Sequence, residues 1–347
     1  MAKEYRATVA AIRSVYGKRL TAADYRDLLN LHSLPEIVAF LKDTERYGEL
    51  LRGIDPAFTH RGYLEMLLQR YPFIQCLHFC RLEQLRKVPF FRFFIYDREI
   101  RELVKAIRLL PNAPQGYISA MDAWIAPYLD ISTEAIARAT DAEGLIAALA
   151  HTPYAAVLKK QLQPDGTLPY TASEIALRVC YLQRMRDDAR AAFKPAEIAV
   201  LHNLIGEQID LINIINAYRM KSVFHADEET LRSMLLPISG KLPQRFCEEL
   251  YTAPDASAFL TALRNTRYGR QLPDLPGEEE SVRMEHAFQT LRCRTAQNAL
   301  HFSEHAAISL YAMHVLDEAE VRNIITVIEG IRYEKPVSYL QSLLILT

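Results

Sequence analysis

The side chains best suited to chemistry are His301, Glu304 and His305, in the segment HFSEH. They match the HxxEH pattern of one class of zinc hydrolases. If the segment is helical, both imidazoles lie on one face and could bind a zinc ion. A third ligand would have to come from the sequence that follows, which offers Glu318, Glu320, Glu329 and Glu334. The simpler interpretation is that two histidines lie on a helix without a metal.

Other catalytic signatures are absent from the sequence. It contains no Walker A motif, no G-x-G-x-x-G and no G-x-S-x-G, and it has only 12 glycines. The five cysteines include no CxxC pair, and reduced thiols of an intracellular protein are the interpretation we prefer. They are Cys76, Cys80, Cys180, Cys247 and Cys293. We therefore expect no catalytic residue, no cofactor and no metal.

The composition indicates a soluble helical protein. Half of the 347 residues are hydrophobic and 24% are charged, and glycine is scarce for a turn-rich β fold. The formal net charge is −1, so the chain lacks the positive field that nucleic-acid binding requires. We expect no nucleic acid among its partners.

No segment of the sequence predicts a membrane span. The N-terminal residues are charged throughout and lack the apolar region of a secretory signal. The most aromatic run, Pro89–Tyr96, is interrupted by Arg92 and is far shorter than the roughly 20 apolar residues that a spanning helix needs. The run could contact lipid or a partner, but we expect it to pack inside the first of three predicted lobes, since it lies just before the closing helix of that lobe.

One short motif occurs three times. The segments are LKDTERYGELL (41–51), LAHTPYAAVL (149–158) and LRNTRYGRQL (263–272). Each has a leucine, a threonine three residues later and then a tyrosine. The threonine–tyrosine pairs are Thr44 and Tyr47, Thr152 and Tyr154, and Thr266 and Tyr268. The first copy has one additional residue between the two.

A helix is predicted before each motif. Ser33, Asp141 and Asp255 each lie eleven residues before the threonine and are good N-cap residues. Apolar residues follow at i, i+3, i+4 and i+7, which is one stripe of an α-helix. The threonine then lies at the helix end, where its hydroxyl can bond a backbone carbonyl. We expect the tyrosine to turn into the core with its hydroxyl at the edge.

A second shared block closes each repeat. It reads EIRELVKAIR (99–108), DLINIINAYR (210–219) and EVRNIITVIE (320–329), and its apolar residues again have helical spacing. One polar position is common to the three blocks and holds Glu102, Asn213 and Asn323. A period of roughly 110 residues is too long for a solenoid and has the size of a small domain. We therefore predict an all-α protein of three similar lobes, residues 1–112, 113–224 and 225–347.

These features resemble the C/d subunits of V-type and archaeal-type (A-type) ATPases. The resemblance covers nearly the whole chain. It depends on the threonine–tyrosine motifs, the two later closing blocks, the N-terminal YRATVAAIRSVYGKRLTAADYRDLL and the segment LLPISGKL. The extra residue before Tyr47, and Glu102 in place of asparagine, depart from the pattern.

The resemblance implies a non-catalytic rotor connector in the central stalk. In that family three helical lobes form a funnel on the cytoplasmic face of the membrane, seated on the proteolipid rotor ring. The shaft subunits D and F enter its open end, and the connector transmits torque during proton or sodium transport. The protein would then be a peripheral part of the complex, with the shaft and the ring as partners and no transmembrane segment of its own.

Two other functions are compatible with the residues alone. A helical adaptor of another assembly would have the same internal repeat but bind different proteins. A zinc hydrolase would use His301, Glu304 and His305. Bound zinc in the purified protein would distinguish the hydrolase from both non-catalytic alternatives.

Overall fold

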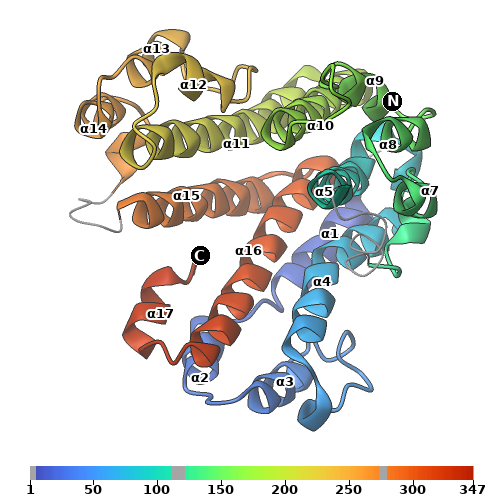
Figure 1. The fold of residues 1–347 in the computed structure, drawn as a ribbon. Coiled ribbons are helices and arrows are strands. Elements are labelled where there is room, and N and C mark those ends of the chain that lie inside the picture. Colours follow the sequence, from blue (N-terminus) through green and yellow to red (C-terminus); the bar gives the residue numbers. More distant parts are fainter. Residues whose placement is uncertain (1–4, 111–121, 273–279, 347) are drawn as a thin grey trace. The chain divides into compact units, whose positions relative to one another are not determined.

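The computed structural model describes residues 5–110, 122–272 and 280–346, which are helical and contain no strand (Figure 1). This confirms the predicted all-α class. The described residues divide into two compact units. The terminal unit combines the residues up to Lys87 with those from Glu285 onwards, and the central unit is Val88–Met284. The division into three lobes stays a prediction, and its first boundary, at residue 112, lies outside the described residues.

The terminal unit is built from both ends of the chain. α4 and α16 pack against each other, α1 lies against both, and α17 packs on α16 and α2 (Figure 1). Apolar residues of α2, α3 and α4 share one core with those of α16 and α17. The helices are α1 (Arg6–Tyr16), α2 (Ala22–Leu29), α3 (Leu34–Asp43), η1 (Pro56–Phe58), α4 (Arg61–Leu82), η2 (Leu85–Lys87), α15 (Glu280–Phe302, beginning in the central unit), α16 (Ala306–Arg332) and α17 (Val337–Leu343).

The central unit is organised around the long helix α10. This helix packs against α5, α9 and α11, and α11 in turn contacts the shorter helices α12, α13 and α14. The helices are η3 (Pro89–Arg92), α5 (Phe93–Leu109), η5 (Ala126–Tyr128), α7 (Thr133–Arg138), α8 (Ala142–Ala148), α9 (Pro153–Lys159), α10 (Tyr170–Ala192), α11 (Pro195–Ser222), α12 (Glu228–Ser233), α13 (Gln244–Tyr251), α14 (Ala256–Arg264) and η6 (Gly269–Gln271).

The predicted helix starts are confirmed. Ser33, Asp141 and Asp255 are the N-cap residues of α3, α8 and α14. Their side chains accept backbone N–H groups at 3.4, 2.7 and 2.8 Å. Each bond satisfies a donor that the first helical turn leaves without an intrahelical partner.

The closing blocks lie at the ends of longer helices. Residues 99–108 belong to α5, 210–219 to α11 and 320–329 to α16, and the last two helices have 28 and 27 residues. The aromatic side chains of the run before α5 are buried, but they do not pack inside the first predicted lobe alone. Phe90 and Phe91 have ring contacts with Phe193, which lies outside the first predicted lobe.

Among the described residues, α11 is the one helix long and apolar enough to pass a membrane-span test, and half of its most apolar window is buried. Asp210 and Asn213 on this helix bind backbone groups of residues 236–242. Buried core helices can be as long and apolar as membrane-spanning helices. These polar contacts to the rest of its unit indicate that α11 is a core helix.

Candidate functional site

Each copy of the repeated motif has a threonine that lies one to four residues after the end of a helix. The hydroxyls of Thr44, Thr152 and Thr266 donate to the carbonyl of the leucine three residues earlier, at 2.7, 2.8 and 2.7 Å. In the first and third copies, the same oxygen accepts the backbone N–H of Tyr47 or Tyr268, both at 3.2 Å. The threonine hydroxyl therefore holds the backbone where it leaves the helix. In the first and third copies it also fixes the backbone position of the tyrosine.

The tyrosine of each motif donates its hydroxyl to a carboxylate that begins a closing block. We call these the tyrosine–carboxylate pairs. They are Tyr47 with Glu320, Tyr154 with Glu99 and Tyr268 with Asp210, at oxygen–oxygen distances of 2.8, 2.6 and 2.6 Å. All six side chains are buried, so the expectation of a hydroxyl at the edge of the core is wrong. Each tyrosine hydroxyl lies inside the core because the buried carboxylate beside it needs hydrogen-bond donors.

Each of these carboxylates also accepts a backbone N–H from the segment that leads into a short helix. The donors come just before α2, α7 and α13. They are Leu20 for Glu320 at 3.2 Å, Asp130 for Glu99 at 2.5 Å, and both Lys241 and Leu242 for Asp210 at 2.8 Å. One acidic side chain thus holds two other segments of the chain against its own helix.

The pairs connect the three predicted lobes in order. Glu99, from residues 1–112, holds Tyr154 of the second predicted lobe, and Asp210 of the second holds Tyr268 of the third. Within the terminal unit, Glu320 of the third predicted lobe holds Tyr47 of the first. A predicted lobe therefore cannot be separated from the next without breaking a buried hydrogen bond.

The two asparagines of the shared polar position bind an extended segment by its backbone. Asn213 donates to the carbonyl of Leu236 at 3.1 Å and accepts its N–H at 2.8 Å. Asn323 makes the same two bonds to Ile345, at 2.8 and 2.9 Å. Because an amide both donates and accepts, it can pair with one residue as a neighbouring strand would.

Glu102 occupies the equivalent position in α5 but makes different contacts. A carboxylate cannot donate a hydrogen bond, and here it forms ion pairs with Arg98 at 2.9 Å and Lys105 at 3.0 Å. All three residues lie on α5. The departure from asparagine thus replaces a contact to another segment with contacts inside one helix.

Close backbone approach makes glycine necessary at one of these sites. A Cβ atom on Gly240 would lie 1.8 Å from Oδ1 of Asp210, far inside van der Waals contact. The segment LLPISGKLP therefore reaches α11 only because residue 240 has no side chain.

The first motif contains a buried cation that strengthens its pair. The guanidinium of Arg46 forms ion pairs with Asp317 and Glu320, donates to the carbonyl of Val15 at 3.1 Å, and lies 5.0 Å from the ring centre of Tyr71. Arg19 approaches Glu320 as well, at 3.1 Å. Two arginines and two carboxylates thus balance their charges where water is excluded.

Burial shifts the pKa values of this network. Burial lowers the pKa of Arg46, but the nearby carboxylates outweigh that effect and the net pKa is raised. Burial raises the pKa of Asp317 to about 6, although Arg46 opposes the shift. Burial also raises the pKa values of Glu99 and Asp210, against the hydrogen bonds that they accept. Burial therefore disfavours the ionised form of these carboxylates in the folded protein.

The geometry required by the zinc alternative is not present. α15 ends at Phe302 and α16 begins at Ala306, so His301 and His305 do not share one helix face. The hydroxyl of Ser303 accepts the N–H of His305 at 3.1 Å in the turn between the helices. His305 is the N-cap residue of α16, and the HxxEH segment is a helix boundary.

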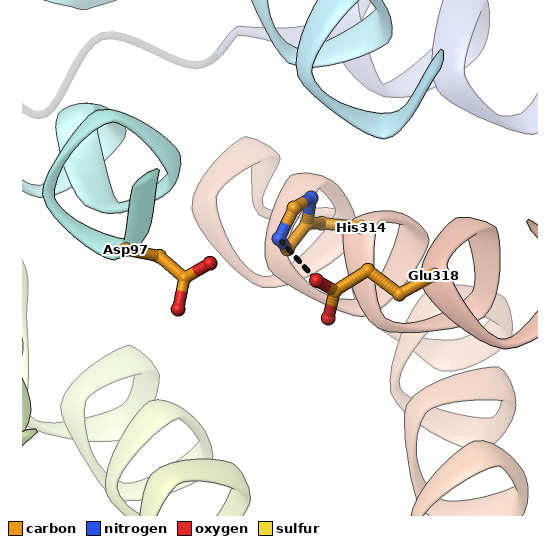
Figure 2. A group of neighbouring side chains, drawn as sticks. All are labelled: Asp97, His314 and Glu318. Carbon is orange, nitrogen blue, oxygen red and sulfur yellow. Dashed lines mark ion pairs between the residues drawn. The ribbon is translucent and has the colours of Figure 1, made fainter. Parts of the chain in front are cut away.

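A third histidine, His314, is buried in the terminal unit. Nε2 of His314 is 3.8 Å from a carboxylate oxygen of Glu318 one turn later on α16 (Figure 2). Its Nδ1 lies 3.7 Å from Sγ of Cys76. Burial raises the pKa of the Cys76 thiol well above its ordinary value, which disfavours the reactive thiolate. Asp97, also drawn in Figure 2, belongs to the central unit.

Sequence reasoning missed the carboxylates themselves. Glu99, Asp210 and Glu320 are the first residues of the three aligned blocks, and an acidic residue three positions before the shared polar residue was visible in all of them. That recurrence was the signal that could have found them. It was hidden because acidic residues are common at exposed helix positions and burial cannot be read from one sequence.

Comparison with known families places the chain among ATP synthase subunits. The model of the ATP synthase (C/AC39) subunit family matches residues 8–342, nearly the whole chain. The chain belongs to this family. Relatives include the C subunit of the A-type ATP synthase of Thermococcus kodakarensis, 25% identical over 276 residues, which cover 78% of this chain and 70% of the relative. The corresponding C subunit of Methanocaldococcus jannaschii is 25% identical over 290 residues, covering 81% and 70%. The protein is therefore a C-type subunit of an A/V-type ATP synthase.

Proposed function

We propose that this protein is the non-catalytic connector between the central shaft, made of the D and F subunits, and the proteolipid rotor ring in the membrane. The observation that carries the proposal is the family match across residues 8–342, together with relatives named as C subunits of A-type ATP synthases. The connector would lie on the cytoplasmic face as a peripheral subunit and transmit torque during proton or sodium transport. It would need no cofactor of its own.

The buried hydrogen bonds support a mechanical role. A connector that transmits torque must not shear internally, and each tyrosine–carboxylate pair crosses from one predicted lobe to the next. Buried hydrogen bonds to charged groups contribute about 1.5–3 kcal/mol each. Within its own unit, each pair therefore resists separation of the two predicted lobes that it joins.

Co-purification tests the proposal directly. The tagged chain is expressed with the D and F subunits of the same organism, and the complex is isolated by the tag. We expect stoichiometric recovery of both shaft subunits, and recovery of the proteolipid ring when membranes are solubilised in mild detergent. Isolation of the folded chain without D and F under both conditions would overturn the proposal.

A further inference from the structure

The central unit has an open groove along α10. The groove has a volume of about 880 Å³, within the size range of ligand-binding clefts. Its walls are α9 on one side and residues 232–237, at the end of α12 and beyond, on the other. Its floor is one face of α10.

The floor is an apolar stripe on a helix that is otherwise well packed. Ala172, Ile175, Ala176 and Val179 lie at i, i+3, i+4 and i+7 and line the groove. They are half-buried or exposed, whereas Leu177, on another face of α10, is fully buried in the core. A stripe with this spacing normally faces another helix.

The side chains of the groove are small enough for a helix to approach closely. The floor has two alanines, Ala172 and Ala176, and the α9 wall has a third, Ala156. Small residues let helix backbones pack at short distance, and an amphipathic helix in an apolar groove is a common mode of peptide recognition.

The rim of the groove is positively charged. Lys160 and Arg184 line it. Among the described residues neither forms an ion pair with an acidic side chain, but the guanidinium of Arg184 lies 3.5 Å from the ring centre of Tyr96 and its charge favours the ionised form of Asp188. Asp187 is paired with Arg190 at 2.8 Å, and the charge of Arg232 is offset by Glu228 and Glu248. The exposed positive charge of Lys160 favours an occupant with acidic residues.

We propose that this groove binds an amphipathic α-helix of another subunit of the ATP synthase, whose apolar face packs on the small residues of α10 and whose acidic flank faces Lys160 and Arg184. The inference rests on the proposed function, since it supplies that function with one of its contact surfaces.

Cys180 in the groove provides a probe that needs no mutation. The assembled complex and the isolated chain are alkylated with iodoacetamide at the same pH, and modification is followed by mass spectrometry. Cys247, half-buried and outside the groove, is the internal reference. We expect Cys180 alkylation to slow at least about tenfold relative to Cys247 on assembly, as 90% occupancy would produce. An unchanged ratio would overturn the proposal.

A photo-crosslinker identifies the occupant. Benzoylphenylalanine at Ala176 should crosslink the complex to a partner segment whose apolar residues recur every three or four positions and that carries carboxylates on one side. Crosslinks to lipid, to a second copy of this chain or to a non-helical segment would each overturn the proposal.

Charge reversal gives a matched pair of variants on two adjacent lysines. Lys160→Glu changes a groove residue, whereas Lys159→Glu changes its exposed neighbour outside the lining. We expect the first to reduce the protection of Cys180 and the second to leave it largely unchanged; equal effects would contradict the acidic flank. Should the chain assemble with D and F while Cys180 stays reactive, the inference fails and the proposed function stands. Failure to assemble at all counts against the proposed function.

Discussion

Tyr47 and Glu320 are 273 residues apart in the sequence, yet the tyrosine hydroxyl lies 2.8 Å from the carboxylate. The other two pairs join residues only 55 and 58 apart. The same local contact is therefore made twice between consecutive segments and once between the beginning and the end of the chain. This long-range pair belongs to the terminal unit, whose core contains residues from both ends.

Removing the tyrosine hydroxyls should destabilise the protein unequally. After Tyr154→Phe, Glu99 would retain the backbone N–H of Asp130 as a donor, whereas Asp210 would retain two backbone donors after Tyr268→Phe. We expect a loss of about 1.5–3 kcal/mol in the free energy of unfolding, with Tyr154→Phe at the upper end. Chemical denaturation followed by circular dichroism measures it.

Tyr63→Phe is the matched control for this series because Tyr63 is 46% exposed. Tyr63→Phe should change the free energy of unfolding by no more than about 0.5 kcal/mol, as most surface substitutions do. Equal effects of Tyr63→Phe and Tyr154→Phe would show that the buried pairs contribute no special stability.

Arg46→Met should be among the most damaging single substitutions. It leaves Asp317 and Glu320 buried with less positive charge, and breaking such a pair from one side costs about 3–5 kcal/mol. Adding Asp317→Asn removes one of the uncompensated charges and should recover part of the loss. A double-mutant cycle at pH 7.5 measures the coupling, and strictly additive effects would contradict the ion-pair network.

The two asparagines should be sensitive to a change of one atom. Asn213→Asp and Asn323→Asp retain the acceptor but lose the donor, so the carbonyl of Leu236 or Ile345 is left buried without its bond. We expect each to cost about 1–3 kcal/mol, the penalty for an unsatisfied buried group. Asn265→Asp, at the exposed end of α14, is the control. Thermal unfolding of the three variants gives the comparison.

The sequence was sufficient to predict features that depend on local chemistry. Ser33, Asp141 and Asp255 are N-caps because short polar side chains favour that position, and apolar spacing located the helices that follow. The helical class and the helices of the closing blocks could be predicted in the same way. These features depend on neighbours within a few residues.

The features that the sequence could not predict depend on distant residues. Nothing near Glu320 indicates that Tyr47 and Arg46 will surround it, because that contact forms between opposite ends of the chain. The HxxEH segment shows the converse, since its local spacing indicated one helix. In the structure, Ser303 and His305 form a turn that separates two helices. Motif spacing alone does not determine where a helix stops.

Asp317 should make stability depend on pH in a direction opposite to that of most acidic residues. The pKa of Asp317 is about 6 in the folded protein, against an ordinary value of 3.8 for an exposed aspartate. Between these two pH values the folded state binds a proton that the unfolded state lacks. Stability from this group is present below about pH 4 and is lost as pH rises through 6, by roughly 3 kcal/mol.

Comparison with Asp317→Asn separates this effect from the other acidic residues and histidines of the chain. Denaturation curves of both proteins are measured from pH 4 to pH 8. We expect the native protein to lose stability relative to the variant across pH 4–7 and the difference to be constant above. Parallel pH profiles would show that Asp317 titrates normally.

Fragments distinguish the two compact units from the three predicted lobes. Residues 113–224 lack Glu99, which holds Tyr154, and lack Leu236, which pairs with Asn213, so this fragment should not unfold cooperatively. Val88–Met284 retains both contacts and the Tyr268–Asp210 pair, and it should show a cooperative thermal transition by circular dichroism. Residues 1–87 lack α16 and α17, which supply part of their core, and should gain helix only when mixed with residues 285–347. Cooperative unfolding of 113–224 alone would instead favour three independent lobes.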